Sequence, residues 1–245
     1  MKFTKLAYTG SLLIVGLGLC SSTAATIRVP QDQPTITAGV AAAQNGDTVA
    51  VSSGTYDETN IQITHAITLT SLTGPTNTII DCQHLGRGLV INNATSAKVS
   101  IIGFTIQNAQ IPNYEGGAAI HVPSGKCDIS GCIIQGASGP GSYTGAPISN
   151  NGANIDDVLV ENCIVRNNFA ANGCGIGGCA VRSCLIYGNS AGNNPGALWG
   201  CHSTNCTVYG NTGGFLSNPW TVGGMNDGTA DNCIFWGNSG LTFWR

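Results

Sequence analysis

The chain has 245 residues, a formal net charge of −3 at pH 7, and 9% charged against 42% hydrophobic residues. This length suits one large domain or two small ones, and a repeat fold can use all of it as one. The negative charge argues against a basic surface for nucleic acid or an anionic membrane. The low charge, with many β-branched residues, argues against a disordered chain.

Residues 1–25 are predicted to be a secretory signal peptide. Lys2 and Lys5 are followed by a short apolar run at 12–19 and then by small residues. The run is shorter than the roughly 20 apolar residues that cross a bilayer, so we expect no membrane span. Cys20 raises a lipoprotein alternative, but a bulky leucine precedes it. We expect a secreted protein, extracellular or at the cell surface, with the other ten of its 11 cysteines in the mature chain.

Residues 26–70 are predicted to form an N-terminal cap and the first strands. Strands are expected at Thr26–Val29, Thr48–Val51 and 61–70. Pro34 suits a first helical position, and Asn45-Gly46 suits the end of a helix. The apolar stripe of this helix consists of Ile36, Val40 and Ala43. A short helix across the end of a solenoid would shield its core and its unpaired strand edges.

Residues 71–245 contain a sequence repeat. Six segments align without gaps, with their central positions at Phe104, Cys132, Cys163, Cys184, Cys206 and Cys233. The intervals are 28, 31, 21, 22 and 27 residues. Such variation around a constant motif indicates a strand pair joined by loops of changing length. Apolar positions recur with a period of two inside each segment, which is typical of strands.

Gly and Asn mark two bends in each segment, because both residues tolerate the left-handed backbone of a tight corner. The first bend lies just before the central residue. The second lies five residues after it, at Asn168, Asn189, Asn211 and Asn238. Stacking the segments about 4.8 Å apart turns shared positions into columns, so these asparagines are expected to hydrogen-bond to one another. We therefore predict an all-β fold, a right-handed parallel β-helix (solenoid) with a short N-terminal helix cap.

The order of four N-terminal motifs carries a family resemblance. These motifs are Pro34-Thr35-Ile36, Asn45-Gly46-Asp47-Thr48-Val49, Gly54-Thr55-Tyr56-Asp57-Glu58 and Thr78-Ile79-Ile80-Asp81. They resemble the start of right-handed parallel β-helix proteins of the pectin lyase-like superfamily, and the later segments resemble its β-helix repeats. The resemblance covers nearly the whole mature chain and implies the fold. It also implies a polysaccharide lyase, a glycoside hydrolase, a carbohydrate esterase or a phage-type adhesin.

The active-site elements of the best-known enzymes in that superfamily are missing from the chain. It lacks the Gln-Asp-Thr element of pectin methylesterases, the Asn-Thr-Asp and Gly-His-Gly elements of polygalacturonases, and the Trp-Ile-Asp-His of pectate lyases. Asp156-Asp157 resembles the paired aspartates of polygalacturonases, but without their flanking motifs. The resemblance therefore implies a fold more specifically than an activity.

The cysteines of an exported chain favour disulfides, but their periodic positions favour packing. Cys163, Cys184 and Cys206 occupy one position in successive segments. Stacked parallel side chains point the same way, which strains the torsion of a disulfide. We expect mostly packed thiols, with a bridged ladder as the alternative and Cys174–Cys179 as a local bridge. A zinc site at that pair is a further alternative, but the cysteine pattern follows the repeat, so we predict no metal site.

Outward positions on the first strand of each segment give the candidate catalytic residues Glu161, Arg182 and His202. Glu161 and Arg182 are expected to be neighbours, with His202 one segment further on and diagonal. A carboxylate, a guanidinium and an imidazole on one face can perform acid–base chemistry on a sugar. An arginine beside a developing carbanion suits elimination from uronic acids. The alternative is a solvated face with a weak salt bridge.

Outward positions on the second strand become apolar and aromatic towards the C-terminus. The candidate ligand-binding residues are Arg166, Tyr187, Tyr209 and Trp236. Aromatic rings with polar tips suit sugars or protein partners, and large exposed apolar patches mark interaction sites. In the alternative, a loop at 216–227 folds over this stripe and buries it. Trp199 and Trp220 are expected to pack at corners.

Two functions follow from these patterns. The prediction is binding of a polysaccharide or cell-surface glycan without catalysis, because the charged face is small and no family motif supports it. The alternative is a polysaccharide-degrading enzyme, a lyase or glycoside hydrolase, acting on uronic-acid-type glycans. We expect no cofactor, with Ca²⁺ entering only for a lyase. The last residues, 243–245, begin a new strand, which suggests either a truncated gene product or an end covered by another subunit. The aromatic stripe is the other candidate surface for a protein partner.

Overall fold

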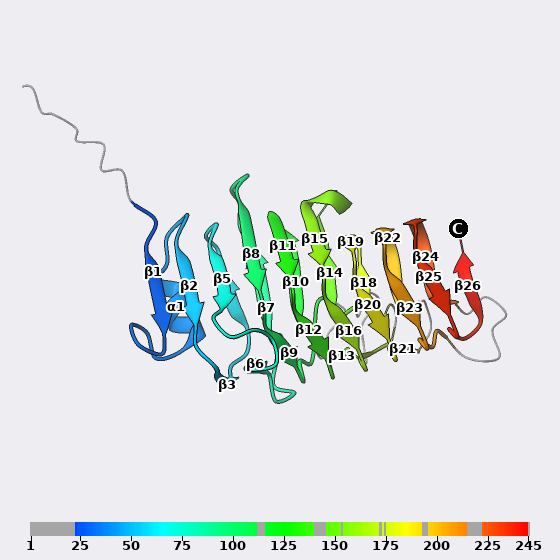
Figure 1. Ribbon diagram of the computed structural model, residues 1–245, viewed down its shortest axis with the longest axis horizontal. Helices are drawn as coiled ribbons and strands as arrows, with labels where there is room; N and C mark the ends of the chain where they lie inside the picture. Colours follow the sequence, from blue (N-terminus) through cyan, green and yellow to red (C-terminus); the bar gives the residue numbers. More distant parts are fainter. Residues whose placement is uncertain are drawn as a thin grey trace, which may run out of the picture.

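The computed structural model describes residues 23–111, 116–139, 146–152, 154–171, 173, 175–192, 196–214 and 222–244. Within these residues the chain is mostly β, with short strands in long parallel sheets (Figure 1). Residues 1–22 of the predicted signal peptide lie outside this part of the chain.

The described strands form parallel sheets of 15, 8 and 3 strands. The 15-stranded sheet has two branches, which share the long strands β22 (Leu198–Thr204) and β24 (Val222–Asp231). Its first branch is β1 (Thr26–Val29), β2 (Thr48–Val51), β5 (Thr68–Ser71), β8 (Lys98–Ile102), β11 (Lys126–Ser130), β15 (Val158–Glu161) and β19 (Ala180–Arg182). Its second branch is β4 (Ile61–Ile63), β7 (Leu89–Asn92), β10 (Ile120–Ser124), β14 (Ile148–Asn150), β18 (Ile176–Gly177) and β26 (Leu241–Trp244).

The remaining described strands, apart from the two branches, form two smaller parallel sheets. The eight-stranded sheet is β3 (Gly54–Asp57), β6 (Thr78–Asp81), β9 (Thr105–Gln107), β12 (Ile133–Gln135), β16 (Ile164–Arg166), β20 (Leu185–Tyr187), β23 (Thr207–Tyr209) and β25 (Ile234–Trp236). The three-stranded sheet is β13 (Ser138–Gly139), β17 (Phe169–Ala170) and β21 (Ser190–Ala191). A 3₁₀ turn, η1 (Ile155–Asp157), precedes β15.

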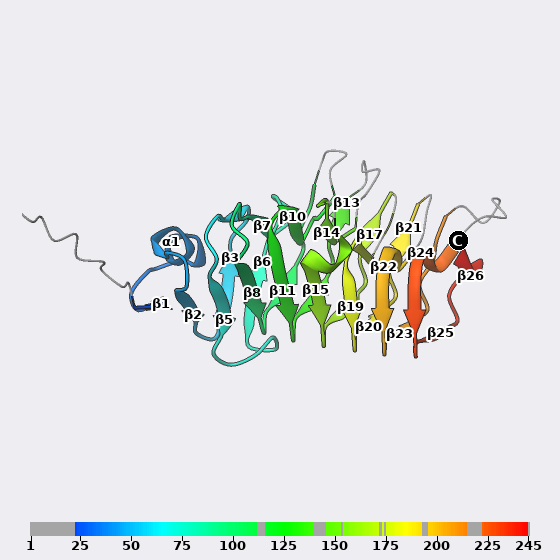
Figure 2. The same ribbon diagram turned by 90° about the horizontal axis from the view of Figure 1, so that it is seen from above.

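Successive strands pass from one sheet to the next and then return beside their starting point. After β15 the chain enters β16, β17 and β18 in turn, and β19 then pairs with β15 in parallel. The strands follow one another along the long axis in sequence order (Figure 2). This connectivity is compatible with the predicted β-helix solenoid.

The predicted alignment of the repeated segments is confirmed by the strand register. Leu159 pairs with Ala180, Ala180 with His202, and His202 with Thr229. The central cysteines are also stacked, because the backbone N–H of Cys163 donates to Sγ of Cys184 at 3.5 Å. Shared sequence positions are therefore columns in space.

Left-handed backbone occurs at every predicted first bend, with φ between 50° and 76°. The residues are Gly103, Gly131, Asn162, Ser183, Asn205 and Asn232. At the second bend the left-handed residue comes one position earlier than the asparagine column, at Asn167 and Gly188 for example. Because the corner is made by the preceding residue, the asparagine that follows it can turn its side chain inward.

The predicted asparagine ladder is present in the core. The Nδ2 atom of Asn168 donates to Oδ1 of Asn189 at 2.8 Å, and Asn189 donates likewise to Asn211 at 2.9 Å. The series continues from Asn211 to Asn238 at 3.0 Å. Asn189 also donates to the carbonyl of Val165 at 3.0 Å. These bonds satisfy amides that would otherwise be costly to bury.

The helix α1 (Ile36–Ala42) packs against β1, β2 and β4 at the N-terminal end of the stack (Figure 2). Its N-cap is Thr35, whose Oγ1 accepts from the N–H of Ala38 at 3.1 Å. The prediction of Pro34 as the first helical residue is therefore wrong, because the side-chain cap sets the start one residue beyond Thr35. The carboxylate of Glu58 accepts from two further free N–H groups, each at 2.7 Å.

Candidate functional site

The candidate site is a column of side chains on the outer surface of the eight-stranded sheet. In register from β6 to β25 lie Asp81, Gln107, Gln135, Arg166, Tyr187, Tyr209 and Trp236. We call these seven residues the polar–aromatic column. All seven are at least partly exposed. The residue before each one, such as Ile134 or Val165, is buried in most strands because successive side chains alternate across a sheet.

Hydrogen bonds join the polar half of the column from one strand to the next. Gln107 donates from Nε2 to Oδ2 of Asp81 at 2.8 Å, and Gln135 donates to Oε1 of Gln107 at 2.9 Å. Oε1 of Gln135 then accepts from Nε and Nη2 of Arg166, at 3.0 and 2.9 Å. Nη1 of Arg166 donates to the hydroxyl of Tyr187 at 2.9 Å. The side chains are thus fixed relative to one another before any ligand arrives.

The aromatic half of the column begins with two stacked tyrosines. The rings of Tyr187 and Tyr209 have centroids 4.9 Å apart and planes 8° apart. Each ring therefore covers one face of the other, so the two inner faces are closed to a partner. The expectation from sequence was that the aromatic rings with their polar tips suit sugars or protein partners, and the stack removes one face of each tyrosine from that surface.

The C-terminal end of the column is open among the described residues. Trp236 is 74% exposed and Ile234 is 62% exposed. Residues 222–227, part of the loop expected to fold over the stripe, instead lie in β24 and pair with β22 and β26. Residues 216–221 lie outside the described residues. The exposed indole of Trp236 is the largest apolar surface of the column.

The acidic end of the column is held in its charged form. Burial raises the pKa of Asp81, but hydrogen bonds from Gln107, the N–H of Gln83 and Asn108 outweigh it, so the net pKa lies below the usual value. A carboxylate that accepts several hydrogen bonds stays ionised. The column therefore runs from a fixed negative charge through amides and a guanidinium to aromatic rings.

The predicted catalytic residues lie together on the first branch of the 15-stranded sheet. Glu161 and Arg182 pair in register, as expected, and no ion pair or hydrogen bond joins these two described side chains. His202 lies on the next strand, two positions from the residue that pairs with Arg182, and its Nδ1 is 3.6 Å from a carboxylate oxygen of Asp156. The carboxylate of Asp157 forms its ion pair elsewhere, with the ammonium of Lys126, at 3.2 Å. The geometry brings the three residues to one face, and their catalytic role stays a prediction.

The described cysteines are free thiols, as packing predicts, and eight of the nine are buried. Cys179 is one of them, so it forms no bridge, while Cys174 lies outside the described residues. Burial raises the pKa of the Cys82 thiol to about 12 and that of Cys127 well above the usual value. Among the described residues no group of three or more His, Cys, Asp or Glu side chains is placed to hold a metal ion.

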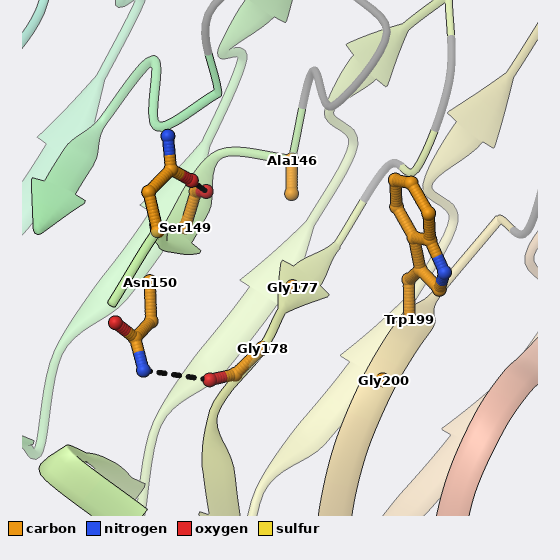
Figure 3. A pocket seen from close by; sticks show the side chains of 8 residues that line it. Ala146, Ser149, Asn150, Gly177, Gly178, Trp199 and Gly200 are labelled. Atoms are coloured by element: carbon orange, nitrogen blue, oxygen red, sulfur yellow. Dashed lines mark hydrogen bonds between the residues drawn. The ribbon is translucent and has the colours of Figure 1, made fainter. Parts of the chain in front are cut away.

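A pocket on the second branch of the 15-stranded sheet was missed by sequence reasoning. It has a volume of about 200 Å³ and is lined by Ala146, Ser149, Asn150, Asn151, Gly177, Gly178, Trp199 and Gly200. Trp199 was expected to pack at a corner, but its half-buried indole forms one wall (Figure 3). The signal available in the sequence was a tryptophan among glycines, which does not distinguish a corner from a pocket wall.

Comparison with models of known protein families finds no match, and comparison with curated proteins finds no significant relative. None of the helices in the described part of the chain is long and apolar enough to cross a membrane.

Proposed function

We propose that this chain is a secreted right-handed parallel β-helix, capped by α1 and of the pectin lyase-like type, that binds an extended polysaccharide or cell-surface glycan without catalysis. The polar–aromatic column is the proposed binding surface. The observation behind the proposal is its continuous cross-strand network from Asp81 to Tyr209, which ends at the exposed indole of Trp236.

A fixed linear array suits a linear polymer. Neighbouring strands are about 4.8 Å apart, close to the length of one sugar unit in an extended chain, so successive units meet successive strands. The side chains are already held by one another, which lowers the entropy lost when they bind. A polymer lying along the column therefore gains several weak contacts at little ordering cost.

The chemistry of the column matches that of a sugar. Sugar rings combine apolar C–H faces with hydroxyl edges, and Trp236 offers an exposed ring face for the former. The amides of Gln107 and Gln135 and the tyrosine hydroxyls can both donate and accept hydrogen bonds. Arg166 uses three of its five N–H groups within the column.

The test is affinity electrophoresis through gels that contain polygalacturonate, xylan, mannan or hydroxyethylcellulose. The variant Tyr209→Ala/Trp236→Ala removes most of the aromatic half of the column. The matched control is Leu72→Ala, which truncates another exposed apolar residue, 59% exposed, in the bend that follows β5 and away from the column. Circular dichroism checks that each variant is folded.

We expect at least one polysaccharide to retard the wild-type protein and the Leu72→Ala control equally. Retardation of the double variant should fall to the level of a non-binding marker protein. Equal retardation of the double variant and wild type would remove the column as the binding surface. Unretarded migration of the wild type in every gel would overturn glycan binding through this column.

A further inference from the structure

The pocket beside Trp199 has an empty centre because a glycine lies between two larger residues. Ser149, Gly177 and Trp199 are in register on the adjacent strands β14, β18 and β22. Figure 3 shows the indole on one side of Gly177 and the side chains of Ser149 and Asn150 on the other. Two strand spacings separate the two walls by roughly 9.6 Å.

Neither backbone conformation nor crowding requires glycine at position 177. Its φ lies outside the left-handed region, and a Cβ built there would be 3.5 Å from Cβ of Ala146, an ordinary contact. Glycine weakens the interior of a strand, and it often marks a bulge, a tight bend, or a place where a ligand or another backbone approaches closely. Beyond its chain neighbours, no backbone atom lies within 4 Å of a Cβ built at Gly177. The absence of a side chain at Gly177 therefore leaves the space open.

The two walls of the pocket differ in chemistry. The indole of Trp199 supplies a flat apolar face, and it lies against Gly173, where a Cβ would be only 3.3 Å from its Cε3. Opposite, Ser149 donates from Oγ to Oδ1 of Asn151 at 2.7 Å, and both residues line the pocket. Asn150 is held by the carbonyls of Asn154 and Gly178, each at 2.9 Å.

We propose that this pocket binds a single neutral pyranose ring. A sugar has an apolar face for the indole and a hydroxyl edge for Ser149 and Asn151. Contact distances of about 3.5–4.0 Å on each side leave room for one ring between the walls. The volume of about 200 Å³ is below the range of roughly 300–1,000 Å³ typical of sites for larger ligands.

Charge and shape select the class of sugar. None of the eight lining residues is ionisable, so the carboxylate of a uronic acid would lose water without gaining a charged partner. A planar aromatic ligand would stack on Trp199 but would offer little to the polar wall. The pocket is on a different sheet from the polar–aromatic column, so this inference does not depend on that column.

The test uses saturation-transfer NMR of the full chain with methyl glucoside, methyl galactoside and methyl mannoside. Galacturonate and adenosine are the charged and planar comparisons. Trp199→Ala removes the apolar wall, and Gly177→Val fills the centre of the pocket. Because valine favours strands and glycine does not, Gly177→Val should keep or raise the melting temperature, so a loss of binding in it cannot be attributed to unfolding.

We expect at least one neutral methyl glycoside to bind the wild type and to bind both variants at least about tenfold more weakly, which corresponds to about 1.4 kcal/mol. The Tyr209→Ala/Trp236→Ala variant should bind that glycoside like the wild type. Absence of neutral glycoside binding, unchanged binding in a folded Gly177→Val protein, or preference for galacturonate or adenosine would each overturn the proposal. Failure of polysaccharide retardation alone would leave this pocket's result unaffected.

Discussion

The guanidinium of Arg166 donates a hydrogen bond of 2.9 Å from Nη1 to the hydroxyl of Tyr187 on the next strand. Through Nε and Nη2 the same group holds Gln135 on the preceding strand. Arg166 is thus the junction between the polar and aromatic halves of the column. The guanidinium is planar and carries several N–H donors, so this one side chain can hydrogen-bond to residues on both neighbouring strands.

Replacing Arg166 should therefore weaken glycan binding more than it weakens the fold. Arg166→Ala removes the junction from a half-exposed site, and we expect polysaccharide retardation to fall strongly while the free energy of unfolding drops by about 1 kcal/mol. Arg166→Lys keeps the positive charge but not the planar group of donors. We therefore expect it to restore more of the lost stability than of the lost retardation. Urea unfolding and affinity electrophoresis measure the two effects. Full retardation in Arg166→Ala would show that the junction is not needed for binding.

The buried asparagine ladder should be a major source of stability. In Asn189→Ala, the backbone N–H of Asn168 loses its acceptor, Oδ1 of Asn189, and the carbonyl of Val165 loses a donor. Each unsatisfied buried group costs about 1–3 kcal/mol, so urea unfolding should show a loss of about 3 kcal/mol or more. Asn77→Ala, an exposed control, should change stability by less than about 0.5 kcal/mol. Similar stability in the two variants would contradict a structural role for the ladder.

Buried thiols should make the fold sensitive to alkali. The Cys82 thiol has a pKa of about 12 in the fold against 9.0 ordinarily. Below pH 9.0 the thiol is protonated in both states, so stability is unaffected. Between pH 9.0 and about 12 the unfolded chain binds fewer protons than the folded chain. Each such thiol then lowers stability by about 1.4 kcal/mol per pH unit.

Thermal melts under reducing conditions, from about pH 7 to about pH 11, measure this effect. Cys82→Ala should flatten the alkaline part of the curve, whatever its effect at neutral pH. A melting temperature independent of pH above 9.0 would contradict burial of free thiols. Native titration with a thiol reagent should find Cys233, which is only partly buried, more reactive than the others described.

The Glu161–Arg182 pair tests the catalytic alternative. These residues are neighbours in register, with His202 nearby. The binding proposal predicts that incubation with polygalacturonate releases no unsaturated or reducing ends. The enzymatic alternative predicts release that Glu161→Ala/Arg182→Ala abolishes. Absorbance of unsaturated products and a reducing-end assay measure both, and release that survives the double variant would place catalysis elsewhere.

The repeat could be predicted because each of its features is local or periodic. Alternation of apolar residues sets which side chains enter the core, and Gly or Asn at corners such as Gly131 and Asn162 sets the turns. Once the segments are stacked in register, the asparagine and cysteine columns follow without further information. The roles assigned to Glu161, Arg182 and His202 stay predictions, since their register says where they lie and not what they do.

The rest of the candidate sites depended on contacts that periodicity does not specify. Asp81 lies outside the six aligned segments, so its link to Gln107 was not predicted. The stacking of Tyr187 on Tyr209 depends on side-chain rotamers, which alternation leaves open. The helix start at Ile36 depended on the side-chain bond of its N-cap, Thr35, which competed with the preference of Pro34.

The sequence by itself determined the parallel stack, its register and its core, because those follow from a period of two and from residues that tolerate corners. Only the tertiary structure decided how outward side chains bind one another and that Gly177 leaves a pocket beside Trp199. The physical reason is that register fixes which residues are neighbours. Rotamers, and the space left by a missing side chain, fix what those neighbours can do.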